Sequence, residues 1–133
     1  MEIIHTDKSS QAIGPYSQAI RVDGWVYTSG VVGMCPDNSI AGDDITSQTH
    51  QVFANLQNIL AAAGCSLQDI VKATVYLADI DEFVAMNEIY SSYMDGHQPA
   101  RSCVEVQRLP RDLRVEIDVC LLYTSDAADD SLR

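Results

Sequence analysis

Basic residues are scarce in this sequence, and their scarcity argues against several kinds of partner. Only 8 of the 133 residues are Lys or Arg, whereas 19 are Asp or Glu, which gives a formal net charge of -11. Proteins that bind nucleic acids carry a basic surface that neutralises phosphate groups. The charge balance therefore argues against RNA or DNA as a partner, although it leaves room for a local basic pocket that binds a small anion.

Long apolar runs are missing too, although 47% of the residues are hydrophobic. A membrane-spanning helix needs about 20 consecutive apolar residues. The first residues, Met1–His5, also lack the basic and long apolar parts of a signal peptide. We therefore expect a cytoplasmic protein with no membrane partner, and the chain length suits a single domain with one core.

Recognisable metal and cofactor motifs are absent as well. The four cysteines, Cys35, Cys65, Cys103 and Cys120, form no CxxC pair, and we expect them to be reduced thiols. The three histidines are scattered, so no spacing predicts a metal site, and no glycine-rich nucleotide motif occurs. The sequence predicts neither a metal nor an organic cofactor.

The end of the chain differs in character from the rest. The segment from Cys120 to Asp130 is similar to the translation of a transposon-type sequencing adapter, and such segments are set aside in fold reasoning. We predict one domain over residues 1–119 and a non-native, adapter-derived tail over 120–133. A natural polar C-terminus is the alternative. If the tail completes the last strand, Leu121 and Tyr123 should face the same way as Val119.

Turn signals and hydrophobic periodicity predict the first half of the fold. Asp23-Gly24 lies between two apolar runs, which favours a hairpin of residues 19–22 with 25–30. A helix should begin near Asp43-Asp44, because acidic residues suit a helix N-terminus, and should end at Gly64. Its apolar residues recur at helical spacing; they are Ile45, Val52, Leu56, Ile59, Leu60 and Ala63.

The second half should contain three more strands and a second helix. A strand is expected over residues 70–78, with Val71, Ala73, Val75 and Leu77 on one face. A helix follows from residues 79–81 to Gly96, and residues 99–106 and 115–119 form the last strands. The order β-β-α-β-α-β-β predicts an α+β fold, a two-layer mixed sheet with both helices on one face. The other face is expected to be buried by oligomerisation. The expected inward residues of the second helix are Phe83, Met86, Ile89, Tyr90 and Tyr93.

Charged and apolar side chains alternate in the last two strands. In the first, Arg101, Cys103 and Glu105 share one face, and in the second Glu116 lies on the polar face. A guanidinium near a carboxylate on rigid elements can bind and protonate a small carboxylic acid. On the residues alone, a salt bridge from Arg101 to Glu105 or Glu116 is the alternative.

These residues closely resemble the Rid family of reactive-intermediate deaminases, also called YjgF-like proteins. The resemblance covers nearly all of residues 1–119, and its motifs are specific in combination. It implies a chorismate-mutase-like fold and a homotrimer with clefts between subunits. It also implies cofactor-free hydrolysis of enamines and imines, such as 2-aminoacrylate and 2-iminopropanoate, to a 2-keto acid and ammonia. The matching segments are residues 12–19, 28–30, 62–65, 69–77, 87–90, 99–106, 109–110 and 115–117.

The resemblance also implies roles for particular side chains. Arg101 would bind the substrate carboxylate, and Glu116 would orient or activate water and move protons to nitrogen. A purely structural role is the alternative for each remaining residue, and for Cys103 a nucleophilic role is a further one. The remaining expected substrate-binding residues are Tyr16, Ser29, Gly30, Asn87 and Cys103.

One departure from the family pattern bears on substrate preference. Where the family typically has Gln after Ser29-Gly30, this chain has Val31-Val32. If the Gln side chain shapes the cleft, the preferred substrate here should differ. The main functional alternative is a non-catalytic trimer that binds small carboxylates or acts as a chaperone-like protein.

Overall fold

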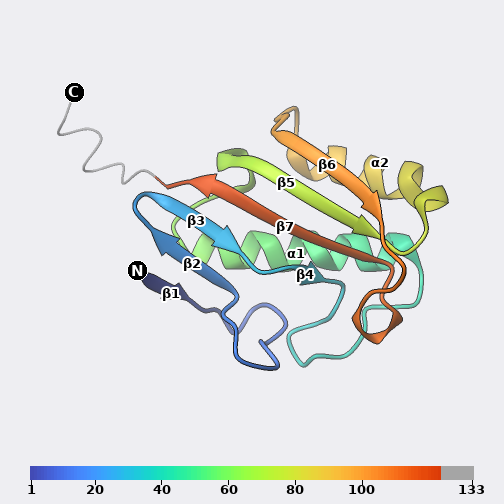
Figure 1. Cartoon of the computed structure of the whole chain (residues 1–133), viewed down its shortest axis with the longest axis horizontal. Coiled ribbons are helices and arrows are strands. Elements are labelled where there is room, and N and C mark those ends of the chain that lie inside the picture. The colour runs from blue at the N-terminus through green and yellow to red at the C-terminus, as the bar shows by residue number, and fades with distance from the viewer. Residues whose placement is uncertain (124–133) are drawn as a thin grey trace.

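A computed structural model describes residues 1–123, which form one mixed sheet with two helices on the same face (Figure 1). In chain order the strands and helices are β1 (Glu2–Ile4), β2 (Ala19–Val22), β3 (Trp25–Thr28), β4 (Val31–Val32), α1 (Ile45–Ala62), β5 (Ile70–Leu77), α2 (Phe83–Met94), β6 (Ala100–Glu105) and β7 (Val115–Leu122). Short 3₁₀ turns lie at Leu67–Asp69, Ile80–Glu82 and Pro110–Asp112.

The sheet order is β1-β2-β3-β7-β5-β6, and β4 also pairs with β7. Among the strands of residues 1–123, only β5 and β6 pair in parallel, and the other pairs are antiparallel. This arrangement confirms the predicted two-layer α+β fold with both helices on one face. No helix among residues 1–123 has the length and apolar character needed to cross a membrane.

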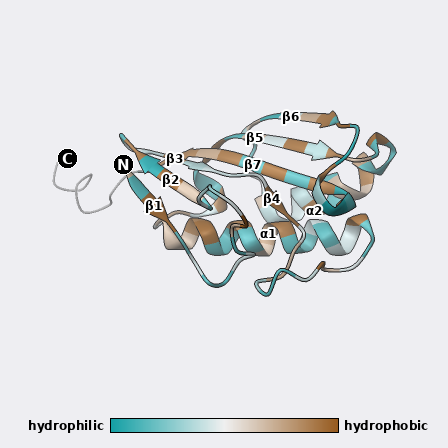
Figure 2. Cartoon of the chain, turned by 60° about the horizontal axis from the view of Figure 1, so that its bottom comes forward, coloured by the Kyte–Doolittle hydropathy of each residue, from teal (hydrophilic) through white to brown (hydrophobic). Residues whose placement is uncertain are grey.

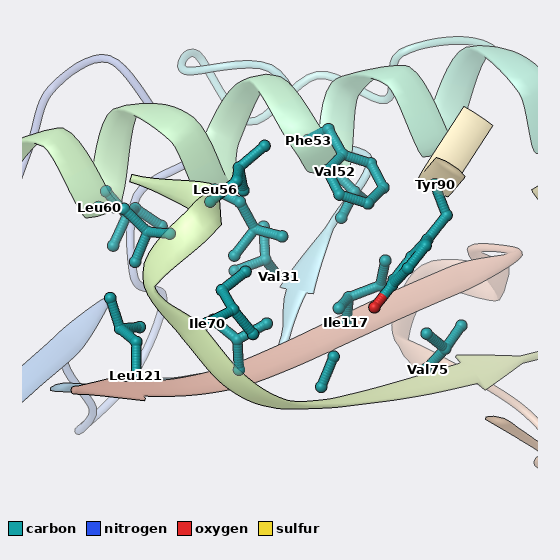
Figure 3. Packing of buried hydrophobic residues seen from close by; sticks show 14 of the residues in the cluster. Val31, Val52, Phe53, Leu56, Leu60, Ile70, Val75, Tyr90, Ile117 and Leu121 are labelled. Atoms are coloured by element: carbon teal, nitrogen blue, oxygen red, sulfur yellow. The ribbon is translucent and has the colours of Figure 1, made fainter. Parts of the chain in front are cut away.

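Helix α1 forms where the sequence predicts it. The Asp44 side chain accepts a hydrogen bond from the backbone N–H of Ser47 at 2.6 Å, which satisfies a donor that the first turn leaves free. Gly64 adopts a φ of 77° just after the helix, a conformation that glycine allows at little cost. The apolar face of α1 packs on β5 and β7 and forms the main core (Figure 3).

Two short strands and the orientation of one side chain differ from the prediction. Strands β1 and β4 were not expected, because they are only three and two residues long. Val71 was placed on the buried face of β5, but it is 43% exposed. The register against β7 shifts between Ile70 and Lys72, so an irregularity rotates Val71 outward while Ala73, Val75 and Leu77 stay buried as predicted.

Strand β7 continues past Val119 into the segment predicted to be non-native. Leu121 is fully buried and Tyr123 packs partly against the core, on the side of Val119, as expected. Hydrophilic and hydrophobic residues alternate along this strand (Figure 2). The remainder of the predicted tail, residues 124–133, lies outside the described residues, and its origin stays a prediction.

Two buried polar side chains of α1 attach the β4 region to the helix. Asn55 is fully buried, and its Nδ2 donates to the carbonyls of Val32 at 3.1 Å and Met34 at 2.8 Å. Gln48 donates to the carbonyl of Gly42 at 3.1 Å and accepts from the N–H of Arg114 at 2.7 Å. These bonds satisfy backbone groups that the two-residue strand β4 and the start of β7 leave unpaired.

We predict that Asn55→Ala lowers the free energy of unfolding by about 1–3 kcal/mol, because it leaves buried carbonyl groups without a donor. Urea denaturation followed by circular dichroism measures this change. Asn58→Ala on the same helix is the matched control. Asn58 makes a single exposed bond to the carbonyl of Lys8, so its loss should have a smaller effect. Equal effects of the two substitutions would contradict the assigned role of Asn55.

Candidate active site

The first group of predicted site residues surrounds the guanidinium of Arg101 on β6. Nη1 of Arg101 donates to Oδ1 of Asn87 on α2 at 2.7 Å. The guanidinium carbon lies 4.6 Å from the ring centroid of Tyr90 and 5.5 Å from that of Phe83. These contacts orient the guanidinium, since aromatic faces attract cations.

Arg101 keeps its charge available for a ligand. Among residues 1–123 it takes part in no ion pair. Its neighbour along the strand, Glu105, instead accepts a hydrogen bond from the N–H of Ile80 at 2.9 Å. The salt-bridge alternative is therefore not formed within the described chain. A cavity of about 440 Å³ borders Arg101, Asn87 and Tyr90, so an anion has room to reach the cation.

Cys103 lies on the same face of β6 as Arg101, two residues along. Burial raises the pKa of its thiol, and the positive charge of Arg101 only partly opposes this effect. The reactive form of cysteine is the thiolate, so this environment favours an unreactive thiol. The geometry supports Cys103 as a lining residue rather than a nucleophile.

The second group of predicted site residues surrounds Glu116 on β7. Gly30 lies directly against this side chain: a Cβ atom added at Gly30 would fall 2.5 Å from Cδ of Glu116. Only glycine fits there without displacing the carboxylate. The Oγ of Ser29 donates to the carbonyl of Ser17 at 2.5 Å, and its N–H donates to Gln18 at 3.0 Å. These bonds hold the Ser29-Gly30 backbone in place.

The surroundings of Glu116 favour its protonated form more than water would. Burial is the main cause of its raised pKa, and the negative charge of Asp118 adds to it. Val32 and Tyr76 are its register partners on the neighbouring strands. Among residues 1–123, Glu116 forms no ion pair. A carboxyl group with a raised pKa is suited to exchanging protons near neutral pH.

A cavity of about 640 Å³ opens beside Glu116 and Gly30. Tyr16 lies on its wall with 52% of its surface exposed, and its hydroxyl accepts a hydrogen bond from the N–H of Ile13 at 3.2 Å. Arg111, which was not among the predicted site residues, also lines this cavity and has a left-handed φ of 58°. Its neighbour Asp112 has a similar φ of 55°, and no motif in the sequence signals this conformation.

The sheet register places Arg101 and Glu116 on opposite faces of the sheet. Arg101 pairs with Ala73 of β5, which is buried under the helices. Glu116 pairs with Tyr76, whose side chain faces the other way, because alternate residues of a strand point to opposite faces. The expected proximity of the guanidinium and this carboxylate is therefore wrong within one chain.

The predicted site residues thus form two separate half-sites. The Arg101 half-site contains Arg101, Asn87 and Cys103, and the Glu116 half-site contains Glu116, Tyr16, Ser29 and Gly30. The first can bind a carboxylate, and the second can exchange protons beside a cavity. No cluster of His, Cys, Asp and Glu suited to a metal ion occurs within residues 1–123.

Comparisons with known proteins agree over nearly the whole described chain. The family model described as Endoribonuclease L-PSP matches residues 6–122. A RutC family protein of Pyrococcus abyssi is 46% identical over 118 residues, covering 88% of this chain and 93% of its own. The 2-iminobutanoate/2-iminopropanoate deaminase of Mus musculus is 45% identical, covering 88% and 87%.

A solved structure agrees with this result. The crystal structure of Escherichia coli TdcF with bound serine superposes with a TM-score of 0.88 at 38% identity, covering 93% of this chain and 100% of that one.

We predict that Asp118→Asn lowers the pKa of Glu116, because it removes a neighbouring negative charge that disfavours the ionised form. The carboxyl carbon of Glu116 can be followed by NMR across a pH titration. Asp7→Asn, a change at an exposed residue far along the chain from Glu116, should leave the midpoint in place. A midpoint that stays constant or rises in Asp118→Asn would show that Asp118 does not act on Glu116.

Proposed function

The chain belongs to the Rid (YjgF-like) family, and on this premise we propose that it hydrolyses reactive enamine and imine intermediates. The substrates are 2-aminoacrylate and 2-iminopropanoate or their close relatives, and the products are a 2-keto acid and ammonia. The observation that carries the proposal is Arg101, an oriented guanidinium without a carboxylate partner in the described chain. The name of the mouse relative supports the same reaction class.

We further propose that the working unit is a homotrimer with one cleft at each subunit contact. The two half-sites lie on opposite faces of the sheet, so the Arg101 half-site of one copy can meet the Glu116 half-site of the next. A contact between two different surfaces is heterologous, and a ring of such contacts closes when the rotation allows it. Exposed apolar residues on the helix-free face, such as Tyr27 and Val104, favour burial of that face between copies.

In this cleft Arg101 holds the substrate carboxylate through paired hydrogen bonds. Glu116 takes a proton from water while the water oxygen bonds to the iminium carbon and the C=N pair moves to nitrogen. The protonated Glu116 then gives this proton to the amino group of the carbinolamine. The C–N bond breaks, ammonia leaves, and the hydroxyl oxygen forms the C=O bond as its proton returns to the carboxylate.

The proposed reaction needs only a modest lowering of the activation barrier. Imines of this kind hydrolyse without a catalyst, and each tenfold acceleration needs only about 1.4 kcal/mol of barrier reduction. Positioning by Arg101 and proton exchange by Glu116 can supply this without a cofactor. We place the reaction in the cytoplasm, in keeping with the four free cysteines.

We predict that Arg101→Ala abolishes activity and leaves the fold intact, because it removes the carboxylate anchor from a partly exposed strand position. A pyridoxal-phosphate dehydratase acting on serine supplies 2-aminoacrylate, and the decay of its imine is followed with and without the protein. Ammonia release is measured in parallel. Full activity in Arg101→Ala would exclude this mechanism. Saturable carboxylate binding by the wild type without ammonia release would instead support the non-catalytic binder.

We also predict that two inactive variants restore each other. In mixed assemblies of Arg101→Ala with Glu116→Gln, about one cleft in four should contain an intact Arg101 from one copy and an intact Glu116 from its neighbour, because each contact joins two different surfaces. Co-refolding the two variants, followed by the same imine assay, measures the recovery. Co-refolded samples of either variant alone are the controls. Mixed assemblies as inactive as the controls would place both residues in the same copy's site.

A further inference from the structure

The cavity beside Glu116 is larger than the methyl side chain of 2-iminopropanoate needs, and part of its wall is apolar. It has a volume of about 640 Å³, and its wall includes Ile13, Val32, Met34 and Leu113. We propose that it holds the side chain of the substrate and that the preferred substrates are 2-imino acids with long or branched apolar side chains, such as the one derived from leucine. This inference rests on the proposed deaminase function and specifies its substrate class.

The three substituents of the imine carbon indicate which part of the substrate the cavity would hold. The carboxylate goes to Arg101 of the neighbouring copy, and the nitrogen and the attacking water must lie near Glu116. The remaining substituent is the side chain. Gly30 leaves room for the Glu116 side chain, and both residues line the cavity. A side chain longer than methyl can therefore extend into it from the reacting carbon.

The walls nearest to Glu116 are apolar. Val32 is the register partner of Glu116 on β4, so the two side chains are neighbours on the same face. A small hydrophobic cluster, separate from the main core, lies next to them: Met34, Leu109 and Leu113 are buried, and Val32, Tyr76 and Val106 pack on them. This cluster offers a substrate side chain apolar contact, which favours a hydrocarbon occupant.

Val31 borders the cavity from the core side of the sheet, because it is part of the main core. Only 5% of its surface is exposed, and it lines the cavity together with Ile59 of α1. Figure 3 shows Val31 between α1 and the sheet, near Leu56. Val31 pairs in register with Ile117 and its side chain points into the core. Val32 pairs with Glu116, so its side chain lies on the face of Glu116. Val32 is therefore the residue of this pair that adds apolar surface next to Glu116.

The wall also has polar members, among them Ser9, Gln11, Gln18 and Arg111. Of these, Arg111 carries a positive charge and favours a different occupant. Its Nη1 donates to the carbonyl of Asn38 at 2.9 Å and lies 3.8 Å from the sulfur of Met34. The carbonyl engages one of its donors, and no carboxylate within residues 1–123 forms an ion pair with its charge. An imine with an acidic side chain, such as that derived from glutamate, is therefore the competing substrate that the test must include.

The test compares 2-imino acids formed in place by a broad-specificity L-amino-acid oxidase from leucine, alanine and glutamate. We expect kcat/KM for the leucine imine to exceed that for the alanine imine by at least about tenfold, because a methylene in an apolar pocket is worth about tenfold or more. Ile13→Ser and Val32→Thr should lower this ratio several-fold, because Val32 lines the cavity on the face of Glu116. Thr is nearly isosteric with Val, and thermal unfolding checks that each variant is folded.

Ile3→Ser is the matched control for Ile13→Ser. Ile3 is 65% exposed and Ile13 66%, but Ile3 lies on β1 and does not line the cavity. The leucine-to-alanine ratio should be the same in Ile3→Ser as in the wild type. An equal loss of preference in both variants would overturn the assignment of the cavity, because it would show a general effect of surface polarity.

The outcomes separate this inference from the function on which it rests. Hydrolysis of the alanine imine at a rate equal to or above that of the leucine imine would overturn the substrate preference and leave the deaminase function standing. A preference for the glutamate imine would do the same and assign the cavity to acidic side chains through Arg111. No acceleration with any imine would overturn the proposed function itself.

Discussion

Alternate side chains of a β-strand must point to opposite faces of the sheet, and in this protein that constraint separates the two groups with the clearest chemistry. Strands β6 and β7 flank β5, and their registers place Arg101 under the helices and Glu116 on the other face. Neither group can reach the other face unless the register of its strand shifts by one residue, and such a shift would bring charged residues into the core. A single site that contains both groups therefore needs two copies of the chain, as in the proposed trimer.

The two half-sites differ in how the fold prepares them. Arg101 is oriented by side chains of α2, namely the amide of Asn87 and the ring of Tyr90, so its charge is directed without being neutralised. Glu116 is prepared differently: a glycine leaves room for its side chain, and burial, together with the negative charge of Asp118, raises its pKa. A fixed cation and an adjustable proton carrier suit the two needs of imine hydrolysis, which are binding a constant carboxylate and moving a proton twice.

The sequence predicts the fold where signals are local. Asp44 and Gly64 delimit α1, and Asp23-Gly24 marks the hairpin, because caps and turns depend on neighbouring residues. The identities of the site residues followed from the family motifs. Alternation within a strand shows which residues share a face, but the face of the sheet depends on pairing with distant strands. This is why the opposite placement of Arg101 and Glu116, the irregularity at Val71 and the conformation of Arg111 could not be predicted.

Asn55 also governs how the region around Gly30 and Val32 moves. A two-residue strand with few ladder bonds would ordinarily open by itself, and its amide protons would exchange with solvent at little cost. Because Asn55 donates to the carbonyls of Val32 and Met34 from the buried face of α1, this segment should open only when α1 also moves. Hydrogen exchange in the segment should then be coupled to exchange in the core, so that one wall of the cavity opens as slowly as the whole domain.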